Sequence, residues 1–142
     1  MKKTIFLILF CAGAIAVSAQ QYKRPPNVVM RSYQKEYRVY NNPTWDMQNN
    51  QWHTRWLDKE NGNRNVDVYY DKDGRRIQTG REWDPLRLPA PVRERISNRY
   101  HEENYSAYRL ERPGKIPFYQ ITLAANKKVV YINEKGREVR YY

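Results

Sequence analysis

The fold is decided by a ten-residue stretch that occurs twice. Val68–Ile77 reads VYYDKDGRRI, and Val130–Val139, which begins 62 residues later, reads VYINEKGREV. Each copy has a β-forming run, a polar turn with a glycine, and a second β-forming run, which is the pattern of a β-hairpin. Gly74 and Gly136 stand where such a turn requires a positive φ. The sequence therefore predicts a tandem repeat with one such hairpin in each unit.

The likeness between the two copies continues upstream of the hairpins. Apolar residues follow a proline at spacings of three, four and four residues in both units, and the two sets are Pro26, Val29, Tyr33 and Tyr37, and Pro89, Val92, Ile96 and Tyr100. These spacings bring the residues to one face of a helix, with the proline near its start. We therefore expect helices at about Asn27–Arg38 and Pro91–Glu102.

Runs of β-forming residues follow each expected helix, with turns between them. The expected strands are Thr44–Met47, Trp52–Leu57, Asn65–Tyr70, Arg75–Thr79, Tyr105–Glu111, Phe118–Leu123, Lys128–Ile132 and Arg137–Tyr141. The connection Trp83–Pro89 is too short and too apolar for a free linker, so units one (about 26–88) and two (about 89–142) form a single domain. The predicted fold class is α+β: two tandem α-β-β-β-β units, with helices packed on one face of an antiparallel sheet.

The N-terminus has the three-part pattern of a secretory signal peptide. Lys2 and Lys3 form a positively charged start, Thr4–Val17 is an apolar run, and small residues precede a cut after Ala19. The alternative is an uncleaved anchor helix, but the run is shorter than the roughly 20 residues that span a membrane. We expect residues 1–19 to be removed and the mature chain to be periplasmic or secreted.

Composition excludes several kinds of chemistry. The chain has 142 residues, a net charge of +11, and 13 Tyr, 4 Trp and 3 Phe, which favour a packed core over disorder. Signal-peptide cleavage removes Lys2, Lys3 and the one cysteine, Cys11, so the mature net charge is +9. A mature chain without cysteine forms no disulfide and has no thiol nucleophile or cysteine metal site.

These features resemble those of the PepSY-like proteins secreted by Bacteroidetes, which share the fold of the β-lactamase inhibitor protein (BLIP). The resemblance rests on the duplication, the helix-then-strand order, the strand–D/N-x-x-G–strand hairpin and the motif Leu88-Pro89-x-x-Val92-x-x-x-Ile96-x-x-x-Tyr100. It spans about Pro26 to Tyr141, although no leucine precedes the proline of the first unit. It implies two helices on an antiparallel sheet whose other face is open, a binding or inhibitory role, and no catalytic residues.

The motifs that suggest chemistry each have a structural alternative. Asp71-Lys72-Asp73-Gly74 begins like a calcium loop, but the following residues supply no further oxygen ligands, so a turn is expected. His53 and His101 each lack a second nearby histidine for a metal. Glu102 and Glu103 are adjacent and point to different sides of a helix end. We therefore expect no enzyme activity, no metal and no cofactor.

The excess basic charge is spread along the chain rather than gathered in one run. Nucleic-acid binding usually requires a clustered basic patch, so no nucleic acid is expected as a partner. Acidic proteins, anionic glycans and anionic lipids remain as partners, and the alternative is a basic surface that serves solubility. We expect a monomer.

Strand alternation assigns side chains to the two faces of the sheet. The residues expected to face the helices are Val66, Val68, Tyr70, Ile77, Tyr108, Leu110, Val130, Ile132, Val139 and Tyr141. The residues expected on the open face are Asp67, Tyr69, Arg76, Gln78, Tyr105, Arg109, Val129, Tyr131, Glu138, Arg140 and Tyr142. Trp52 and Trp56 share a face opposite His53 and Arg55, and the pattern leaves open which of the two faces is buried.

The predicted open face is rich in tyrosine and arginine, which are favoured in protein-binding hot spots. The candidate binding residues are Tyr69, Tyr131, Arg76, Arg109 and Arg140. The alternative is cross-strand aromatic pairing that only stabilises the sheet. The sequence thus favours an exported, non-enzymatic binding protein for an unidentified protein target, with inhibition of an enzyme as one form of binding. The alternative function is an envelope protein that binds anionic lipid or glycan by charge.

Overall fold

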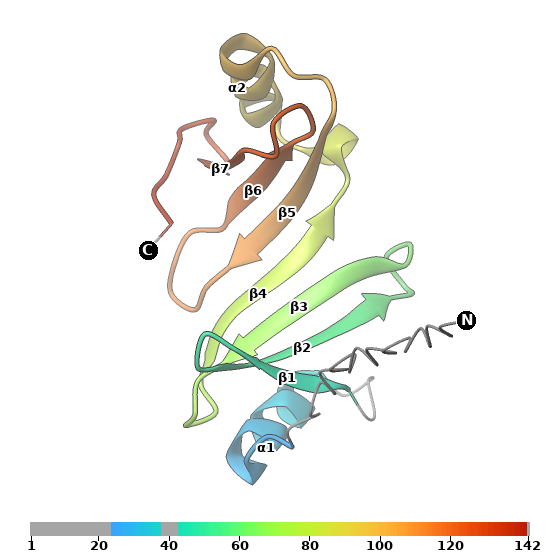
Figure 1. Cartoon of the computed structure of the whole chain (residues 1–142), viewed down its shortest axis with the longest axis vertical. Helices are drawn as coiled ribbons and strands as arrows, with labels where there is room; N and C mark the ends of the chain where they lie inside the picture. Colours follow the sequence, from blue (N-terminus) through green and yellow to red (C-terminus); the bar gives the residue numbers. More distant parts are fainter. Residues whose placement is uncertain (1–23, 38–42, 142) are drawn as a thin grey trace, which may run out of the picture.

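The computed structural model describes residues 24–37 and 43–141, which form an α+β fold on one seven-stranded antiparallel sheet (Figure 1). The elements are α1 (Asn27–Glu36), β1 (Trp45–Gln48), β2 (Gln51–Asp58), β3 (Arg64–Tyr70), β4 (Arg76–Trp83), the 3-10 helix η1 (Pro85–Arg87), α2 (Ala90–Tyr100), β5 (Tyr105–Glu111), β6 (Phe118–Leu123) and β7 (Val129–Asn133). The α+β class, the antiparallel sheet and the helix-then-strand order predicted from the sequence are confirmed.

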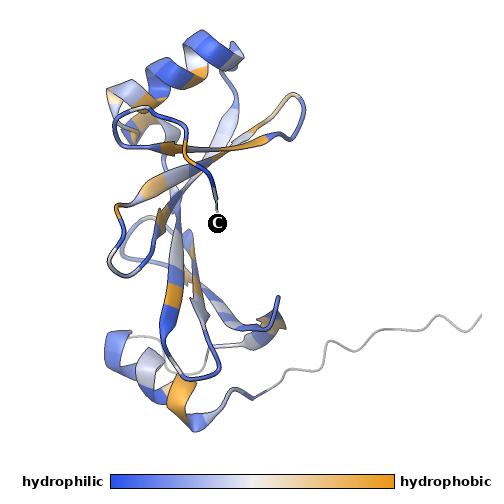
Figure 2. Cartoon of the chain, turned by 90° about the vertical axis from the view of Figure 1, so that its left-hand side faces the viewer, coloured by the Kyte–Doolittle hydropathy of each residue, from blue (hydrophilic) through white to orange (hydrophobic). Residues whose placement is uncertain are grey.

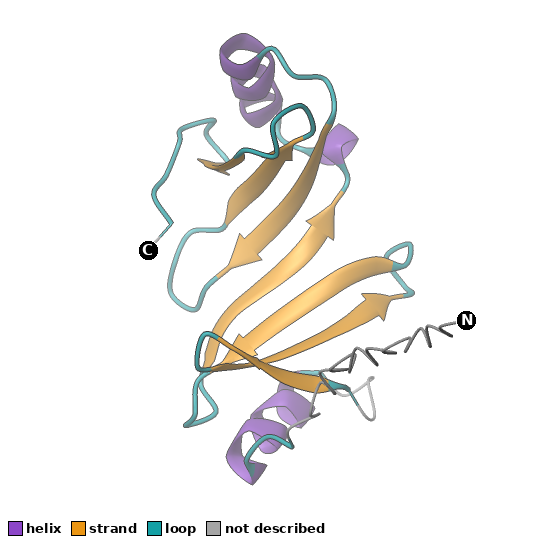
Figure 3. Cartoon of the chain, in the orientation of Figure 1, coloured by secondary structure: helices purple, strands orange, loops and turns teal. Residues whose placement is uncertain are grey.

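The strands cross the sheet in sequence order, from β1 at one edge to β7 at the other (Figure 3). Tight turns join several of the neighbouring strands into hairpins. At the β1–β2 turn, Asn49 and Asn50 both have positive φ values, 48° and 61°, as a two-residue hairpin loop requires. This order places β4 and β5, which are connected through η1 and α2, at the centre of the sheet.

Each helix buries its apolar stripe against a different part of the sheet. Val29 and Tyr33 of α1 are buried in a cluster that also contains Trp45, Trp52, Val66, Val68 and Tyr70. Val92 and Ile96 of α2 are buried in a second cluster with Leu88, Ala107, Tyr119, Ile121, Leu123, Val130 and Ile132. The helices lie at opposite ends of the molecule on the same side of the sheet (Figure 2). Trp52 and Trp56, whose side the sequence left open, both pack in the α1 cluster.

The two glycine turns of the repeated stretch lie against the starts of the two helices. Gly74 and Gly136 have φ values of 77° and 75°. A Cβ on Gly74 would lie 2.8 Å from the carbonyl oxygen of Val28, and one on Gly136 would lie 2.5 Å from that of Pro91. Only glycine allows both the left-handed backbone and this close approach. The turns therefore fix how each hairpin meets its helix.

One expected strand, Arg137–Tyr141, is wrong. This segment forms an isolated bridge between Ile132 and Glu138 and no ladder, with backbone hydrogen bonds from Asn133 N to Arg137 O and from Val139 N to Tyr131 O. Glu138 was expected on the open face, but it accepts a hydrogen bond from Tyr100 of α2 at 2.8 Å. Tyr141 was expected to face the helices, but it lies against Tyr131 on the other face. Alternation does not apply here because the chain leaves the sheet.

The predicted signal peptide, residues 1–19, lies outside the described residues, as do Tyr142 and the expected last residue of the first helix, Arg38. Within the described part of the chain, no helix is long and apolar enough to cross a membrane.

Candidate functional site on the open sheet face

We call the sheet face turned away from the two helices the open face. Backbone pairing defines it, because directly paired residues point to the same side. His53 pairs with Tyr69, Asp67 pairs with Gly80, and Gly80 pairs with Leu110. The helix clusters use the alternate residues of the same strands, so these side chains share the opposite face.

A network of charged side chains occupies the open face of β1–β3. The imidazole of His53, which is only 6% exposed, has Nδ1 2.7 Å from Asp46 Oδ1 and Nε2 2.7 Å from Asp67 Oδ1. Arg55 Nε donates to the same Asp67 oxygen at 2.7 Å, and the Tyr69 ring stacks on the imidazole at 4.6 Å. Each ring nitrogen thus has a carboxylate oxygen within hydrogen-bond distance. His53 is held between two carboxylates.

The charges of this network support one another. Burial alone lowers the pKa of His53, but the hydrogen bonds to Asp67 and Asp46 outweigh it, so the pKa of His53 lies above its ordinary value of 6.5. Burial alone raises the pKa of Asp67, but hydrogen bonds from His53 and Arg55 outweigh it and hold the pKa of that carboxyl below its usual range. These hydrogen bonds favour the charged forms of both groups, and the network makes them internally.

An aromatic–arginine cluster, formed by Arg112, Phe118, Tyr131 and Tyr141, occupies the open face at the other end. Tyr131 and Tyr141 stack with ring centroids 4.8 Å apart. The guanidinium carbon of Arg112 lies 4.4 Å from the Tyr141 ring centroid and 5.5 Å from that of Phe118. Arg112 Nε and the Tyr141 hydroxyl both donate to Gln78 Oε1, at 3.1 and 3.3 Å. Tyr141 is nevertheless 47% exposed, so the cluster presents aromatic surface to solvent.

A hollow of about 380 Å³ lies beside both groups. Five carboxamide side chains, two tyrosines, one arginine and one isoleucine line it: Gln48, Asn49, Gln51, Gln78, Gln120, Tyr69, Tyr141, Arg112 and Ile77. A carboxamide carries both donors and an acceptor. The hollow can therefore hydrogen-bond a group that offers both, such as a peptide unit or a hydroxyl.

Two of the five predicted binding residues, Tyr69 and Tyr131, have their side chains on the open face as expected. Tyr69 lines the hollow, and Tyr131 belongs to the aromatic–arginine cluster. Arg140 is exposed in the segment that follows β7. The binding role of all three residues stays a prediction.

The expected orientation of Arg76 is wrong because of a β-bulge. The register of β3 and β4 shifts between Tyr69 and Tyr70, which leaves Ile77 as an extra residue on β4. Ile77 turns to the hollow, and Arg76 turns to the helix side, where its Nε lies 3.5 Å from Glu36 Oε2 of α1. One inserted residue exchanges the two faces for everything before it on the strand.

The expected orientation of Arg109 is also wrong, because every side chain of β5 points to the face opposite to the one expected. The guanidinium carbon of Arg109 lies 5.6 Å from the ring centroid of Trp83, which packs against the α2 cluster. Ala107 and Tyr105 belong to that side, while Tyr108 and Leu110 lie over Gly80 on the open face. The sequence reading favoured the larger apolar residues for the helix side, but the small Ala107 is the residue buried there.

The site residues that sequence reasoning missed are Arg112, Phe118, Tyr141 and the His53 network. Arg112 shares its side of the chain with Leu110, so a correct orientation of β5 would have found it. The position of Tyr141 carries no local signal, because the last segment forms no strand. His53 was recognised as opposite Trp52, but its carboxylate partners come from two other strands.

The described residues contain no group of three or more His, Cys, Asp or Glu side chains placed to hold a metal. At the turn that resembles a calcium loop, Asp71 Oδ1 accepts the backbone N–H groups of Asp73 and Arg75, both at 2.9 Å. In the second copy, Asn133 Oδ1 accepts those of Lys135 and Arg137 in the same way, both at 3.0 Å. The first carboxylate therefore closes a turn, as an amide does in the other copy.

Solved structures with the same architecture come from Bacteroides. A protein of Bacteroides eggerthii, provisionally described as periplasmic, superposes with a TM-score of 0.74 at 14% sequence identity, covering 83% of this chain and 88% of that one. A DUF2874 family protein of Bacteroides ovatus gives 0.72 at 14% identity over 83% and 86% of the two chains. A BLIP-like protein of Bacteroides fragilis gives 0.69 at 18% identity over 84% and 86%.

This chain has the BLIP-like fold. No protein-family model matches the sequence, and no curated protein matches it. At these identities the structural likeness establishes the fold alone, and function has to be argued from the site.

Proposed function

We propose that this chain is an exported, non-enzymatic binding protein that holds a protein partner on its open face. Export rests on the signal-peptide pattern of residues 1–19, with cleavage after Ala19. The provisional periplasmic description of the B. eggerthii structure agrees with this compartment. The repeated glycine turns against α1 and α2 support two tandem α-β units, the second with one strand fewer.

The observation that carries the proposal is the aromatic–arginine cluster. Stacked tyrosines with an arginine over one ring are the residue types that dominate protein-binding hot spots. The exposed Tyr141 ring and the neighbouring hollow supply a ridge and a depression in which a partner side chain fits. Neither helix covers this side of the sheet (Figure 2).

The partner that fits best has an acidic surface. After cleavage the chain carries 24 Lys and Arg against 15 Asp and Glu, so its field attracts negatively charged proteins and speeds their association. Inhibition of an enzyme is one form that such binding takes, and a β-lactamase is the first enzyme to test because one structural neighbour is described as BLIP-like.

Site-specific photocrosslinking tests which face binds. A photoreactive residue at Gln120, in the hollow, should crosslink a discrete protein when the chain is expressed in its own envelope. The same residue at Arg31, exposed on α1, is the matched control on the helix side and should not crosslink that protein. Equal crosslinking from both positions would contradict the proposal.

The crosslinked protein is then purified and its affinity measured. Tyr131→Ala combined with Tyr141→Ala should weaken binding at least tenfold, while the exposed-residue variant Arg31→Gln should bind as the wild type does. If the double variant folds and binds unchanged, the aromatic–arginine cluster is not the contact.

A second candidate function is binding of an anionic glycan in the hollow. Its carboxamide lining is what favours it, because each sugar hydroxyl is both donor and acceptor and so matches an amide. This function predicts saturable binding to acidic oligosaccharides that Gln120→Ala abolishes. Binding by charge alone would fall steeply with salt, whereas a protein contact anchored by aromatic rings would fall less.

A further inference from the structure

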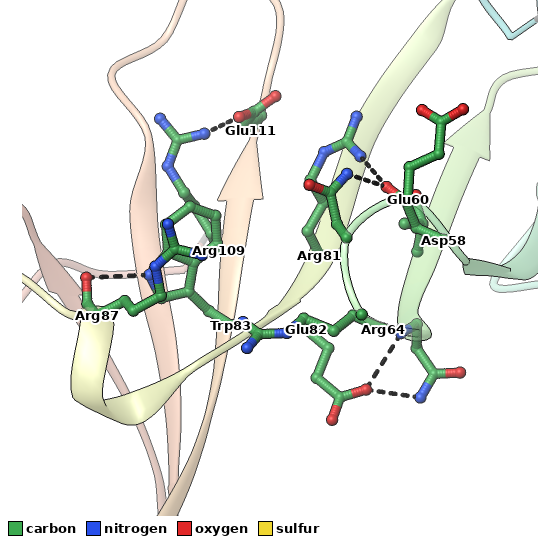
Figure 4. Close-up of a pocket in the computed structure, with 13 residues that line it drawn as sticks. Asp58, Glu60, Arg64, Arg81, Glu82, Trp83, Arg87, Arg109 and Glu111 are labelled. Atoms are coloured by element: carbon green, nitrogen blue, oxygen red, sulfur yellow. Dashed lines mark hydrogen bonds and ion pairs between the residues drawn. The ribbon is translucent and has the colours of Figure 1, made fainter.

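The helix side of the sheet holds a cleft of about 630 Å³, independent of the open face (Figure 4). Its walls come from the end of β2, from β3, β4 and β5, from the β2–β3 turn and from η1. Neither α1 nor α2 supplies a lining residue, so the central strands form the floor. This volume lies in the range of pockets that take small organic ligands, roughly 300–1,000 Å³.

Two arginines lie side by side on the floor of this cleft. Arg81 on β4 and Arg109 on β5 are direct cross-strand partners. Their side chains are 34% and 23% exposed, so solvent screens them only in part. Like charges placed directly opposite each other destabilise a sheet. An anion between the two guanidinium groups would turn this repulsion into attraction.

The carboxylates that contact these two arginines neutralise the guanidinium groups only in part. The ion pair of Arg81 with Asp58 Oδ2 is long, 3.8 Å, and that oxygen already accepts from Asn61 Nδ2 at 2.7 Å. Arg109 contacts the Glu111 carboxylate through Nη1, and its Nη2 lies 3.7 Å from Glu134 Oε1. A guanidinium has five N–H donors, so both arginines retain donors for a ligand.

We propose that the cleft binds a small organic molecule through a carboxylate or phosphate group held between Arg81 and Arg109. The planar guanidinium fork matches the paired oxygens of both anions. The Trp83 ring, with the Arg109 guanidinium carbon 5.6 Å from its centroid, gives an apolar wall for the organic part. Glu82, which also lines the cleft, already accepts two hydrogen bonds from Asn65, at 2.8 and 3.1 Å, which reduces its repulsion of an anion.

Calorimetric titration of the purified exported protein with inorganic phosphate and with citrate tests this site and separates its two anion types. At least one of the two should bind saturably and raise the unfolding temperature. Arg81→Gln should weaken that binding at least tenfold. Arg81→Lys, which keeps the charge but loses the fork, should also weaken it, and it guards against a folding defect in the first variant.

The matched control is Arg31→Gln, which removes the same charge from an exposed position on α1 outside the cleft. It should bind phosphate or citrate as the wild type does. The absence of saturable binding by both anions would overturn the proposal, and so would an equal loss of affinity in Arg31→Gln and Arg81→Gln, because that would indicate non-specific charge attraction.

Discussion

The two ends of the open face are built from opposite chemistry. At β1–β3, His53 and Arg55 both hydrogen-bond to the carboxylate of Asp67, and the side chains of His53 and Asp67 are almost fully buried. At the other end, Tyr131 and Tyr141 stack on each other while Tyr141 keeps nearly half of its surface exposed. Groups that satisfy one another offer little to a partner, whereas an exposed aromatic surface gains by being covered. We therefore expect the polar end to determine stability and the aromatic end to determine binding.

The largest loss of stability at the charged end of the open face is expected from Asp67→Ala. It removes the carboxylate shared by His53 and Arg55 and leaves the buried ring of His53 with one carboxylate partner, so the free energy of unfolding should fall by about 3 kcal/mol. Urea denaturation followed by tryptophan fluorescence measures it. The control Asp73→Ala, in an exposed turn, should leave stability unchanged. A loss no greater than that of the control would show that the network is not structural.

Alanine substitutions at the two glycine turns should lower the free energy of unfolding by different amounts. Gly136→Ala should destabilise by about 3 kcal/mol, because a left-handed alanine is strained and its Cβ meets the Pro91 carbonyl. Gly74→Ala should cost somewhat less, since its closest contact is longer. Gly114→Ala has the same positive φ but open space around it, so about 1 kcal/mol is expected. Thermal unfolding that gives equal losses at all three positions would contradict the packing of turn on helix.

The polar end should also make stability depend on pH through His53. Because the pKa of His53 is raised in the folded state, its contribution is complete below pH 6.5 and is lost as pH rises through the folded pKa. Wild-type stability should therefore decline as pH rises from 6.5 through this folded pKa. His53→Gln should flatten this decline, whereas His101→Asn, the matched control at an exposed helix end, should retain it. Urea midpoints across pH 5 to 9 give the slopes.

The carboxyl of Asp67 should act in the opposite pH range. Its pKa is lowered in the folded state, so its contribution is present above the ordinary carboxyl pKa and is lost as pH falls through the folded value. The free energy of unfolding of Asp67→Asn should therefore change less with pH below 4 than that of the wild type, and urea denaturation at several acidic pH values measures this. An unchanged acid profile would contradict the ionised state of this group.

The smallest effect on stability, with a large effect on binding, is expected from Tyr141→Ala. An exposed ring in a terminal segment should contribute about 1 kcal/mol or less to folding, while its loss should reduce partner affinity at least tenfold, about 1.4 kcal/mol. Tyr69→Ala is the matched change at the polar end and should show the reverse: a larger loss of stability and a smaller loss of affinity. Similar results for the two tyrosines would remove the distinction between the ends.

Sequence reasoning located the strands better than the faces. Tyr105–Glu111 and Phe118–Leu123 were placed at their observed bounds, because alternating β-forming residues end at clear turn signals. Alternation then gives two sets of side chains without saying which set a helix covers. On β5 the buried residue under α2 is Ala107, whose small side chain carries almost no hydrophobic signal, and Arg109 lies on the same side.

The candidate site was half predictable for the same reason. Tyr69 and Tyr131 lie next to strong inward residues, Val68 and Val130, so their outward direction followed from the pattern. The direction of Arg76 could not be predicted in this way. A one-residue bulge at Ile77 exchanges the faces to which the preceding side chains point, and the local sequence gives no sign of it. Arg112 and Tyr141 meet only because the last segment folds back beside β7, and that return is a long-range contact.

The sequence by itself determined the helix-then-strand order, the two glycine turns and the apolar stripes of both helices. These are local properties, since helical and strand periodicity and a positive φ act over a few residues. The tertiary structure alone decided where Arg76 and Arg109 point, which carboxylates enclose His53, and that Arg81 and Arg109 share the floor of a cleft. Those features depend on register between strands, and a shift of one residue exchanges the two faces of a sheet.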